Sequence, residues 1–321
     1  MILRSLIALL AFATPAAARD IALSLPIDCT LGQSCFVQQY VDRDPGPEHK
    51  DYTCGTLSYD GHKGTDFALP SLAAMQAGVD VLSAAAGMVV ATRDDMPDIM
   101  HGADGAPDIS GKECGNGILI KHGGGWETQY CHLKMGSVVV TRGQQVARGD
   151  VLGEVGLSGE TQFPHVHLSL RKNGEVIDPY DGDQTLTCGG KDLHSLWQAD
   201  MAYVGAGVIS LGFGTSVPEY ADIKAGITPP KTLPTDAPAL VLWGYAYGAR
   251  KGDILELLID GPKGEVIRHQ ARLEKAQSQY FRAAGKRLKG AGWPAGSYAG
   301  SVTIIRAGTE LGHAETTLLI E

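Results

Sequence analysis

The stretch that decides the fold is His165-Val166-His167-Leu168-Ser169-Leu170-Arg171. A short run of this kind, bounded by turn residues, is typical of a β-strand. Side chains two apart on a strand project from the same face, so His165 and His167 direct two imidazoles into one space. On its own a His-x-His strand is a weak sign of a metal site, and its meaning depends on the sequence around it.

Working outward from this strand, the chain from residue 20 to about 195 consists of short β-like runs separated by glycines. They are Val79–Ala85, Gly87–Thr92, Gly117–His122, Trp126–Leu133, Ser137–Thr141 and Val151–Gly156. Runs of this length with turn residues between them predict a mostly antiparallel β domain. One short helix is expected between Pro70 and Gly78, where the apolar residues tolerate helix.

The second half of the chain differs in composition. Residues 201–236 are rich in Gly, Pro, Thr and Ser and predict an extended linker. Beyond it, β-like runs at intervals of roughly ten residues predict an immunoglobulin-like β-sandwich over residues 237–321. Trp243, Tyr245 and Tyr247 alternate on one of its strands and must share a face. We expect that face to lie in the sandwich core, with an exposed binding surface as the alternative.

The first eighteen residues resemble a secretory signal. Arg4 precedes an apolar run, and Ala16-Ala17-Ala18 forms a small-residue cleavage site. The run is too short for a membrane span, so we expect export to the periplasm or the extracellular space. The predicted organisation is a signal peptide at 1–18, an N-terminal segment at 19–57 packed on a catalytic domain at 58–200, the linker at 201–236 and the accessory sandwich at 237–321.

Charge and cysteine content narrow the class of protein. A formal net charge of −9 without a basic block argues against nucleic acid as a partner. The 6 cysteines all lie before residue 190, and an even number in an exported chain predicts disulfides. The pairing of Cys114 with Cys131 is favoured, because a hairpin turning at Gly123-Gly124-Gly125 would bring their flanking stretches together.

The residues that carry chemistry are histidines. His62 and Asp66 stand four apart in Gly61-His62-Lys63-Gly64-Thr65-Asp66, and His132 ends a predicted strand. Each signal is weak alone. Their order along the chain, with the His165-Val166-His167 strand last, is more informative than any one of them.

That succession, with the connecting segment from Gly143 to Gly159, resembles the lysostaphin-type zinc endopeptidases of bacterial cell-wall metabolism over residues 58–180. The resemblance implies that His62, Asp66 and His167 bind one zinc ion per chain. Two histidines and a carboxylate leave a fourth tetrahedral position open, as catalytic zinc sites do. His132 and His165 would then act on the attacking water and on the substrate carbonyl or leaving amine, without binding the ion.

The resemblance also implies the function and its alternatives. The expected activity is zinc-dependent hydrolysis of peptide cross-links in peptidoglycan, whose stem peptides would be the partners. The alternative is a non-catalytic zinc-binding or amidase-activating cell-wall protein of the same fold. The C-terminal domain could recruit a cell-wall or envelope partner.

Two segments depart from the family pattern. The lead to the His-x-His strand, Gly159–Pro164, is longer and bulkier than usual, and residues 93–113 form a long polar insertion. We expect this insertion to be a loop at one edge of the groove, with His101 as a surface residue.

Overall fold

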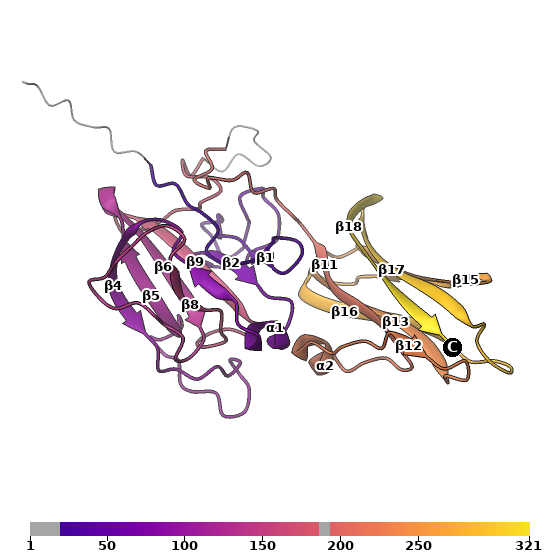
Figure 1. The fold of residues 1–321 in the computed structure, drawn as a ribbon. Coiled ribbons are helices and arrows are strands. Elements are labelled where there is room, and N and C mark those ends of the chain that lie inside the picture. Colours follow the sequence, from indigo (N-terminus) through magenta and orange to yellow (C-terminus); the bar gives the residue numbers. More distant parts are fainter. Residues whose placement is uncertain (1–19, 186–192) are drawn as a thin grey trace, which may run out of the picture.

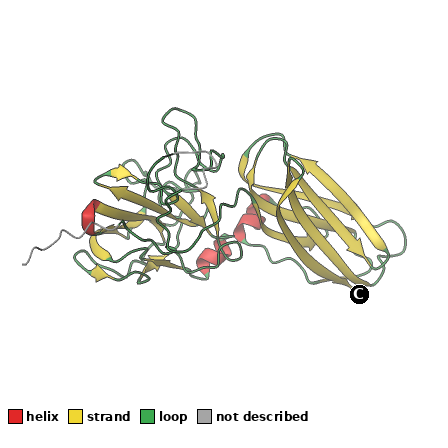
Figure 2. Cartoon of the chain, turned by 90° about the horizontal axis from the view of Figure 1, so that it is seen from above, coloured by secondary structure: helices red, strands yellow, loops and turns green. Residues whose placement is uncertain are grey.

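The computed structural model describes residues 20–185 and 193–321, so the predicted signal peptide lies outside the described residues. Two domains, each built mainly from antiparallel strands, lie side by side along the molecule (Figure 1). Two short helices, α1 (Leu72–Gln76) and α2 (Tyr220–Ala225), lie where the domains meet (Figure 2). Within the described ranges, no helix is both long and apolar enough to cross a membrane.

The first domain is built on one large sheet. Its strands follow the spatial order β1-β2-β9-β6-β5-β4-β7, with β10 paired to β9, while β3 and β8 form a separate pair. The strands are β1 (Phe36–Gln39), β2 (Thr65–Ala68), β3 (Asp80–Leu82), β4 (Gly87–Arg93), β5 (Asn116–Lys121), β6 (Trp126–Leu133), β7 (Gln145–Val146), β8 (Val151–Glu154), β9 (His165–Lys172) and β10 (Glu175–Val176). This arrangement confirms the expectation of a mostly antiparallel β fold.

Strand β9 shows why this domain folds with its histidines on one face. Val166, Leu168 and Leu170 are fully or almost fully buried in the hydrophobic core. Because strand side chains alternate, His165 and His167 project from the opposite face. The apolar half of the strand anchors it in the core, and the histidine half is available to a site above the sheet.

The N-terminal segment is part of the same domain. Strand β1 pairs with β2, and Leu23, Ile27 and Tyr40 belong to the hydrophobic core that also holds the apolar face of β9. The N-terminal segment therefore supplies the edge strand β1 of the large sheet.

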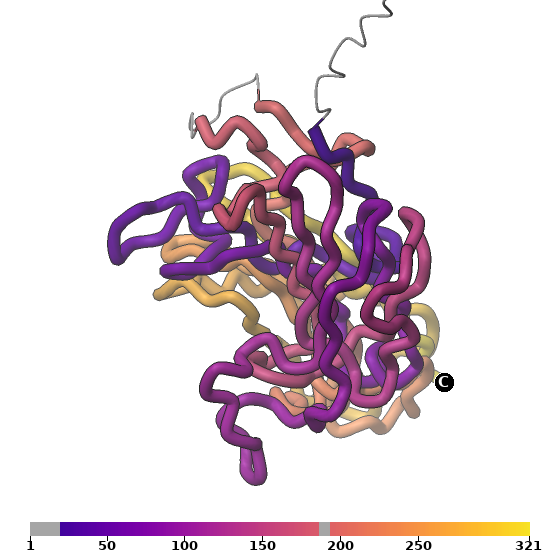
Figure 3. Tube along the Cα trace, turned by 90° about the vertical axis from the view of Figure 1, so that its left-hand side faces the viewer, coloured from indigo at the N-terminus to yellow at the C-terminus, as the bar shows by residue number. Residues whose placement is uncertain are grey.

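The second domain is a β-sandwich, seen behind the first domain in Figure 3. A three-stranded sheet, β11-β13-β16, packs on a five-stranded sheet, β12-β18-β17-β14-β15. Leu242 and Tyr280 from the first sheet share one core with Leu257 and Val302 from the second. The strands are β11 (Gly207–Gly214), β12 (Thr232–Leu233), β13 (Ala239–Ala249), β14 (Ile254–Gly261), β15 (Gly264–Arg272), β16 (Gln277–Arg287), β17 (Gly296–Arg306) and β18 (Thr309–Ile320).

The prediction that 201–236 is an extended linker is wrong, because strands and a helix lie within this stretch. Strand β11 pairs with β13 along its whole length and buries Phe213 in the sandwich core. Helix α2 and strand β12 also lie within it. Gly, Pro, Thr and Ser favour loops locally, but pairing with a long neighbouring strand overrides that preference.

The aromatic face of β13 is also not in the sandwich core. Leu240, Leu242 and Ala246 face the core, so the intervening aromatic residues lie on the other side of the sheet. Trp243 and Tyr245 pack with α2, while Tyr247 stacks on Phe36 of the first domain with 4.5 Å between ring centroids. These residues are buried, as expected. They lie where the sheet meets α2 and the first domain, however, and not in the sandwich core.

Disulfides lie in the first domain. Cys29 is bonded to Cys35, and Cys114 to Cys131, which confirms the pairing favoured from the sequence. Cys54 is also disulfide-bonded, and Cys188 falls outside the described residues.

We predict that replacing both Cys114 and Cys131 by Ser lowers the free energy of unfolding of the first domain by about 3 kcal/mol. The bond closes a loop with a sequence separation of 17, against 6 for Cys29–Cys35, whose removal is expected to cost only about 2 kcal/mol. Hydrogen exchange measured by mass spectrometry reports the stability of each domain separately. Faster exchange in the β-sandwich of either variant would contradict the prediction.

Candidate active site

Strands β2 and β9 bring the predicted site residues together. Asp66 lies directly opposite His167 in the antiparallel register, and His62 lies in the segment just before β2. The Asp66 Oδ1 atom lies 2.8 Å from His167 Nδ1 and 3.2 Å from His62 Nε2. The two ring nitrogens are themselves 3.1 Å apart. Three potential ligand atoms therefore converge on one point.

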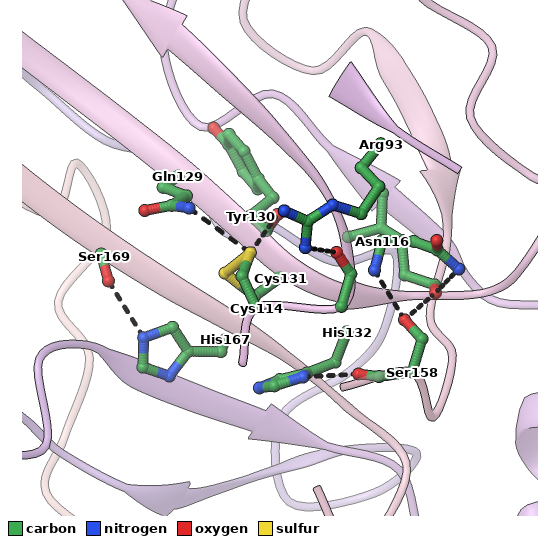
Figure 4. The surroundings of a disulfide bond; sticks show 12 residues. Arg93, Cys114, Asn116, Gln129, Tyr130, Cys131, His132, Ser158, His167 and Ser169 are labelled. Atoms are coloured by element: carbon green, nitrogen blue, oxygen red, sulfur yellow. Dashed lines mark hydrogen bonds between the residues drawn. A yellow bond between two sulfur atoms is a disulfide. The ribbon is translucent and has the colours of Figure 1, made fainter. Parts of the chain in front are cut away.

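Contacts at the second ring nitrogen orient His62 and His167. The Nδ1 atom of His62 donates to the carbonyl of Tyr40 at 2.7 Å, which leaves Nε2 as the atom that faces Asp66. The Nε2 atom of His167 lies 3.0 Å from Ser169 Oγ (Figure 4). Its Nδ1 atom faces the carboxylate of Asp66. Ligand histidines of metal sites are commonly oriented by such a contact at the second ring nitrogen.

Gly64 is required by the close approach of His167. A Cβ at this position would lie 2.5 Å from His167 Nε2 and 2.6 Å from the carbonyl oxygen of Leu168. Any side chain at position 64 would displace the imidazole or the strand that carries it.

A β-bulge aims His132 at the same site. The register between β5 and β6 shifts after Tyr130, so that Cys131 and His132 both lie opposite Gly117. His132 has a φ of 64°, which is strained for a residue with a side chain. Bulges and strained residues of this kind gather at functional sites, where they redirect a side chain.

His132 and His165 form a second pair beside the first group. The Nδ1 atom of His132 donates to the Ser158 carbonyl at 2.8 Å (Figure 4), and that of His165 to the Phe163 carbonyl at 3.0 Å. Their ring centroids are 4.6 Å apart, and His165 Nε2 lies 3.5 Å from Asp66 Oδ1. Each ring thus keeps a free Nε2 lone pair.

Burial and neighbouring groups shift the pKa values of the site residues in different directions. Burial opposes ionisation of Asp66, but His62 and His165 outweigh it and hold its pKa well below the usual range. Burial, with the neighbouring His165 and His167, lowers the pKa of His132 well below that of a free imidazole. Burial also lowers the pKa of His165 and of His167. At neutral pH the carboxylate is charged and these three imidazoles are neutral.

Two overlapping groups could hold a metal ion. One is His62, Asp66 and His167, and the other is His132, His165 and His167. Tetrahedral coordination at zinc-type bond lengths separates ligand atoms by about 3.3 Å, close to the distances within the first group. The first group also contains a buried carboxylate whose ion-pair partners, within residues 20–185 and 193–321, are all histidines. Its donor chemistry therefore fits a divalent cation.

Other residues singled out in the sequence lie around the site. His101 is exposed and lines the cleft above the histidines, so the insertion borders the groove as expected. Tyr59 lies at the rim, with its ring centroid 4.4 Å from that of His62. Tyr130 is a core residue whose hydroxyl accepts from the Ala84 amide at 2.8 Å. The sequence does not predict the contribution of Tyr40, because a backbone carbonyl carries no motif.

The fold and the site define a β-sheet domain with a candidate metal centre of histidines and a carboxylate. Residues 60–179 match peptidase family M23, so this part of the chain is similar to that family.

Curated relatives agree with this assignment. The peptidoglycan DD-endopeptidase ShyA of Vibrio cholerae is 32% identical over 117 residues, which cover 36% of this chain and 22% of the relative. The DD-carboxypeptidase/endopeptidase Mpg of Neisseria meningitidis is 37% identical over 79 residues, covering 24% of this chain and 18% of that protein. The chain thus spans about a fifth of the length of these relatives. A solved catalytic domain of the M23 protein EnpA from Enterococcus faecalis aligns at 23% identity and a TM-score of 0.32, covering 47% of this chain and 92% of that one.

We predict that Gly64→Ala weakens metal binding by about 10- to 100-fold, because it displaces an oriented histidine. Gly123→Ala is the matched control, since a Cβ there meets nothing within 4 Å. Competition with a chelator, on protein whose circular dichroism is unchanged, measures the affinity. Equal metal affinity in the two variants would show that the site tolerates the displacement.

Proposed function

We propose that the chain is a zinc-dependent endopeptidase that hydrolyses peptide cross-links of bacterial peptidoglycan. The observation that carries the proposal is the convergence of His62, Asp66, His132, His165 and His167 in one buried site of an M23 domain. The names of the relatives as peptidoglycan endopeptidases support the choice of substrate.

His62, Asp66 and His167 would hold one zinc ion per chain. Two imidazoles and one carboxylate form a borderline-soft donor set that suits zinc and leaves one coordination position open. The bound ion would polarise the scissile carbonyl and lower the pKa of water, which an uncharged amide requires for hydrolysis.

His132 and His165 would move the protons. Both rings are neutral and fixed through Nδ1, so each can accept a proton at Nε2 and return it to the leaving amine. The carbonyls of Ser158 and Phe163 hold the two rings in place.

The alternative is a non-catalytic zinc-binding or amidase-activating cell-wall protein of the same fold. Such a protein has no need of a proton-transfer pair. All five positions are filled in this chain, which favours the enzyme. We also propose that the protein works outside the cytoplasm, where peptidoglycan lies, after removal of residues 1–18.

Digestion of purified sacculi in water enriched in oxygen-18 tests the proposed activity. Hydrolysis should convert cross-linked muropeptides into products in which one new carboxyl group carries a single heavy oxygen, detected by mass spectrometry. Unchanged sacculi in the presence of zinc-loaded protein would refute the proposal.

We predict that His132→Ala and His165→Ala keep the metal but reduce turnover by about 100- to 10,000-fold, the usual contribution of general acid–base catalysis. His62→Ala and Asp66→Ala should lose both metal and activity. Elemental analysis and rate measurements belong on the same preparations, with His313→Ala in the second domain as the control. Loss of metal from His165→Ala would overturn the assigned ligand set.

We predict that turnover stays constant as the pH falls to about 6.5, the ordinary pKa of histidine, and declines only below it. A base must be neutral, and a lowered pKa extends the neutral form of His132 to more acidic solution. Metal content measured at each pH separates proton transfer from ligand loss. A decline that begins above pH 6.5 with full metal occupancy would contradict the role of this residue.

A further inference from the structure

The cleft above the histidines is built from both domains. It has a volume of about 580 Å³ and is lined by Asp66, His132 and His165 on one side. On the other side it is lined by Lys224 of α2 and by Lys275 and Gln279 of the second domain. The β-sandwich therefore forms a wall of the candidate active site, in a part of the chain outside the M23 match.

Two buried glutamines of β1 form hydrogen bonds to the start of β16. They place this wall beside β2, the strand that carries Asp66. Gln38, which is fully buried, donates from Nε2 to the Ser278 carbonyl at 3.0 Å and accepts at Oε1 from Gln279 at 3.0 Å. Gln39 donates to the Ser278 hydroxyl at 3.3 Å and is itself the register partner of Asp66. The start of β16 is thereby tied to the strand next to Asp66.

Gln39 lines the cleft, and one of its buried polar atoms has no partner among the described residues. The Oε1 atom of Gln39 makes no hydrogen bond within the part of the chain that the structure describes, and the residue is only 7% exposed. An unsatisfied buried carbonyl costs free energy, and a substrate N–H in the cleft would relieve that cost. The amide N–H of a peptide bound along β1 is a donor of the required kind.

Two cations on the sandwich side also lack a carboxylate partner. Neither Lys224 nor Lys275 has an ion pair among residues 20–185 and 193–321, although the chain as a whole carries a net charge of −9. The ammonium of Lys224 lies 5.4 Å from the Tyr220 ring centroid, which holds it at the cleft. The carboxylate of Glu160 lines the same cleft on the side of the first domain, so the positive charge is confined to one wall.

We propose that the β-sandwich is the substrate-selecting wall of the active site and recognises an anionic peptide. Gln39 accepts a backbone N–H of that peptide, and Lys224 and Lys275 bind a free carboxylate close to the scissile bond. The inference rests on the proposed peptidase activity. In this proposal the second domain contacts the substrate directly, instead of recruiting a separate cell-wall or envelope partner.

Two soluble cross-linked peptides test the proposal on the full, zinc-loaded chain. They share one sequence, and one carries free carboxyl groups while the other carries carboxamides. For Lys224→Met and Lys275→Gln we expect kcat/KM on the free acid to fall by about 10-fold, mainly through KM, as for a lost charge-assisted contact. The values for the carboxamide should not change.

Two further variants sharpen the result. Lys263→Gln removes an exposed lysine in a turn of the second domain, away from the cleft, and should leave both substrates unaffected. Gln39→Met should raise KM for both peptides alike, since it removes a contact to the backbone and not to the carboxylate. Its melting temperature, compared with that of the unaltered chain, reports whether the domain contact survives.

The outcomes separate this inference from the proposed function. Hydrolysis of neither peptide by zinc-loaded protein would refute the peptidase itself. Equal hydrolysis of both peptides, unchanged by the lysine variants, would overturn carboxylate recognition and leave the peptidase intact.

Discussion

The site depends on one buried carboxylate, that of Asp66. It is 3% exposed, and its Oδ1 atom lies within 3.5 Å of nitrogen atoms on His62, His165 and His167. A charged group removed from water must be compensated by positive charge and hydrogen bonds. Imidazoles that face it through an unprotonated nitrogen do not supply that charge, and a divalent cation shared with two of them would. Strands β2 and β9 and the turn before β2 bring these side chains together.

The rest of the molecule supports that cluster from a distance. The N-terminal segment supplies the Tyr40 carbonyl that orients His62, and β1 supplies the edge to which the second domain is attached. The bulge in β6 turns His132 toward the site at the expense of a strained backbone. The aromatic face of β13 is buried against α2 and Phe36, so the sandwich is held against the catalytic domain and lines its cleft.

Much of the fold and the site could be predicted from local sequence. The strand alternation of β9 and the spacing of His62 and Asp66 depend on residues close together in the chain, and the structure brings these residues into one cluster. The Cys114–Cys131 bond likewise follows from a short hairpin. The failures concern long-range contacts. The composition of residues 201–236 favours a linker, yet pairing with β13 makes Gly207–Gly214 a strand, and nothing local marks Gln39 or Lys275 as cleft residues.

Anomalous diffraction at the zinc absorption edge, from crystals of the zinc-loaded protein, tests the central claim most directly. The account predicts a single strong peak within about 2.2 Å of His62 Nε2, Asp66 Oδ1 and His167 Nδ1, with His132 and His165 free of the ion. A peak coordinated by His132, His165 and His167 instead, or no peak in this cleft, would contradict it.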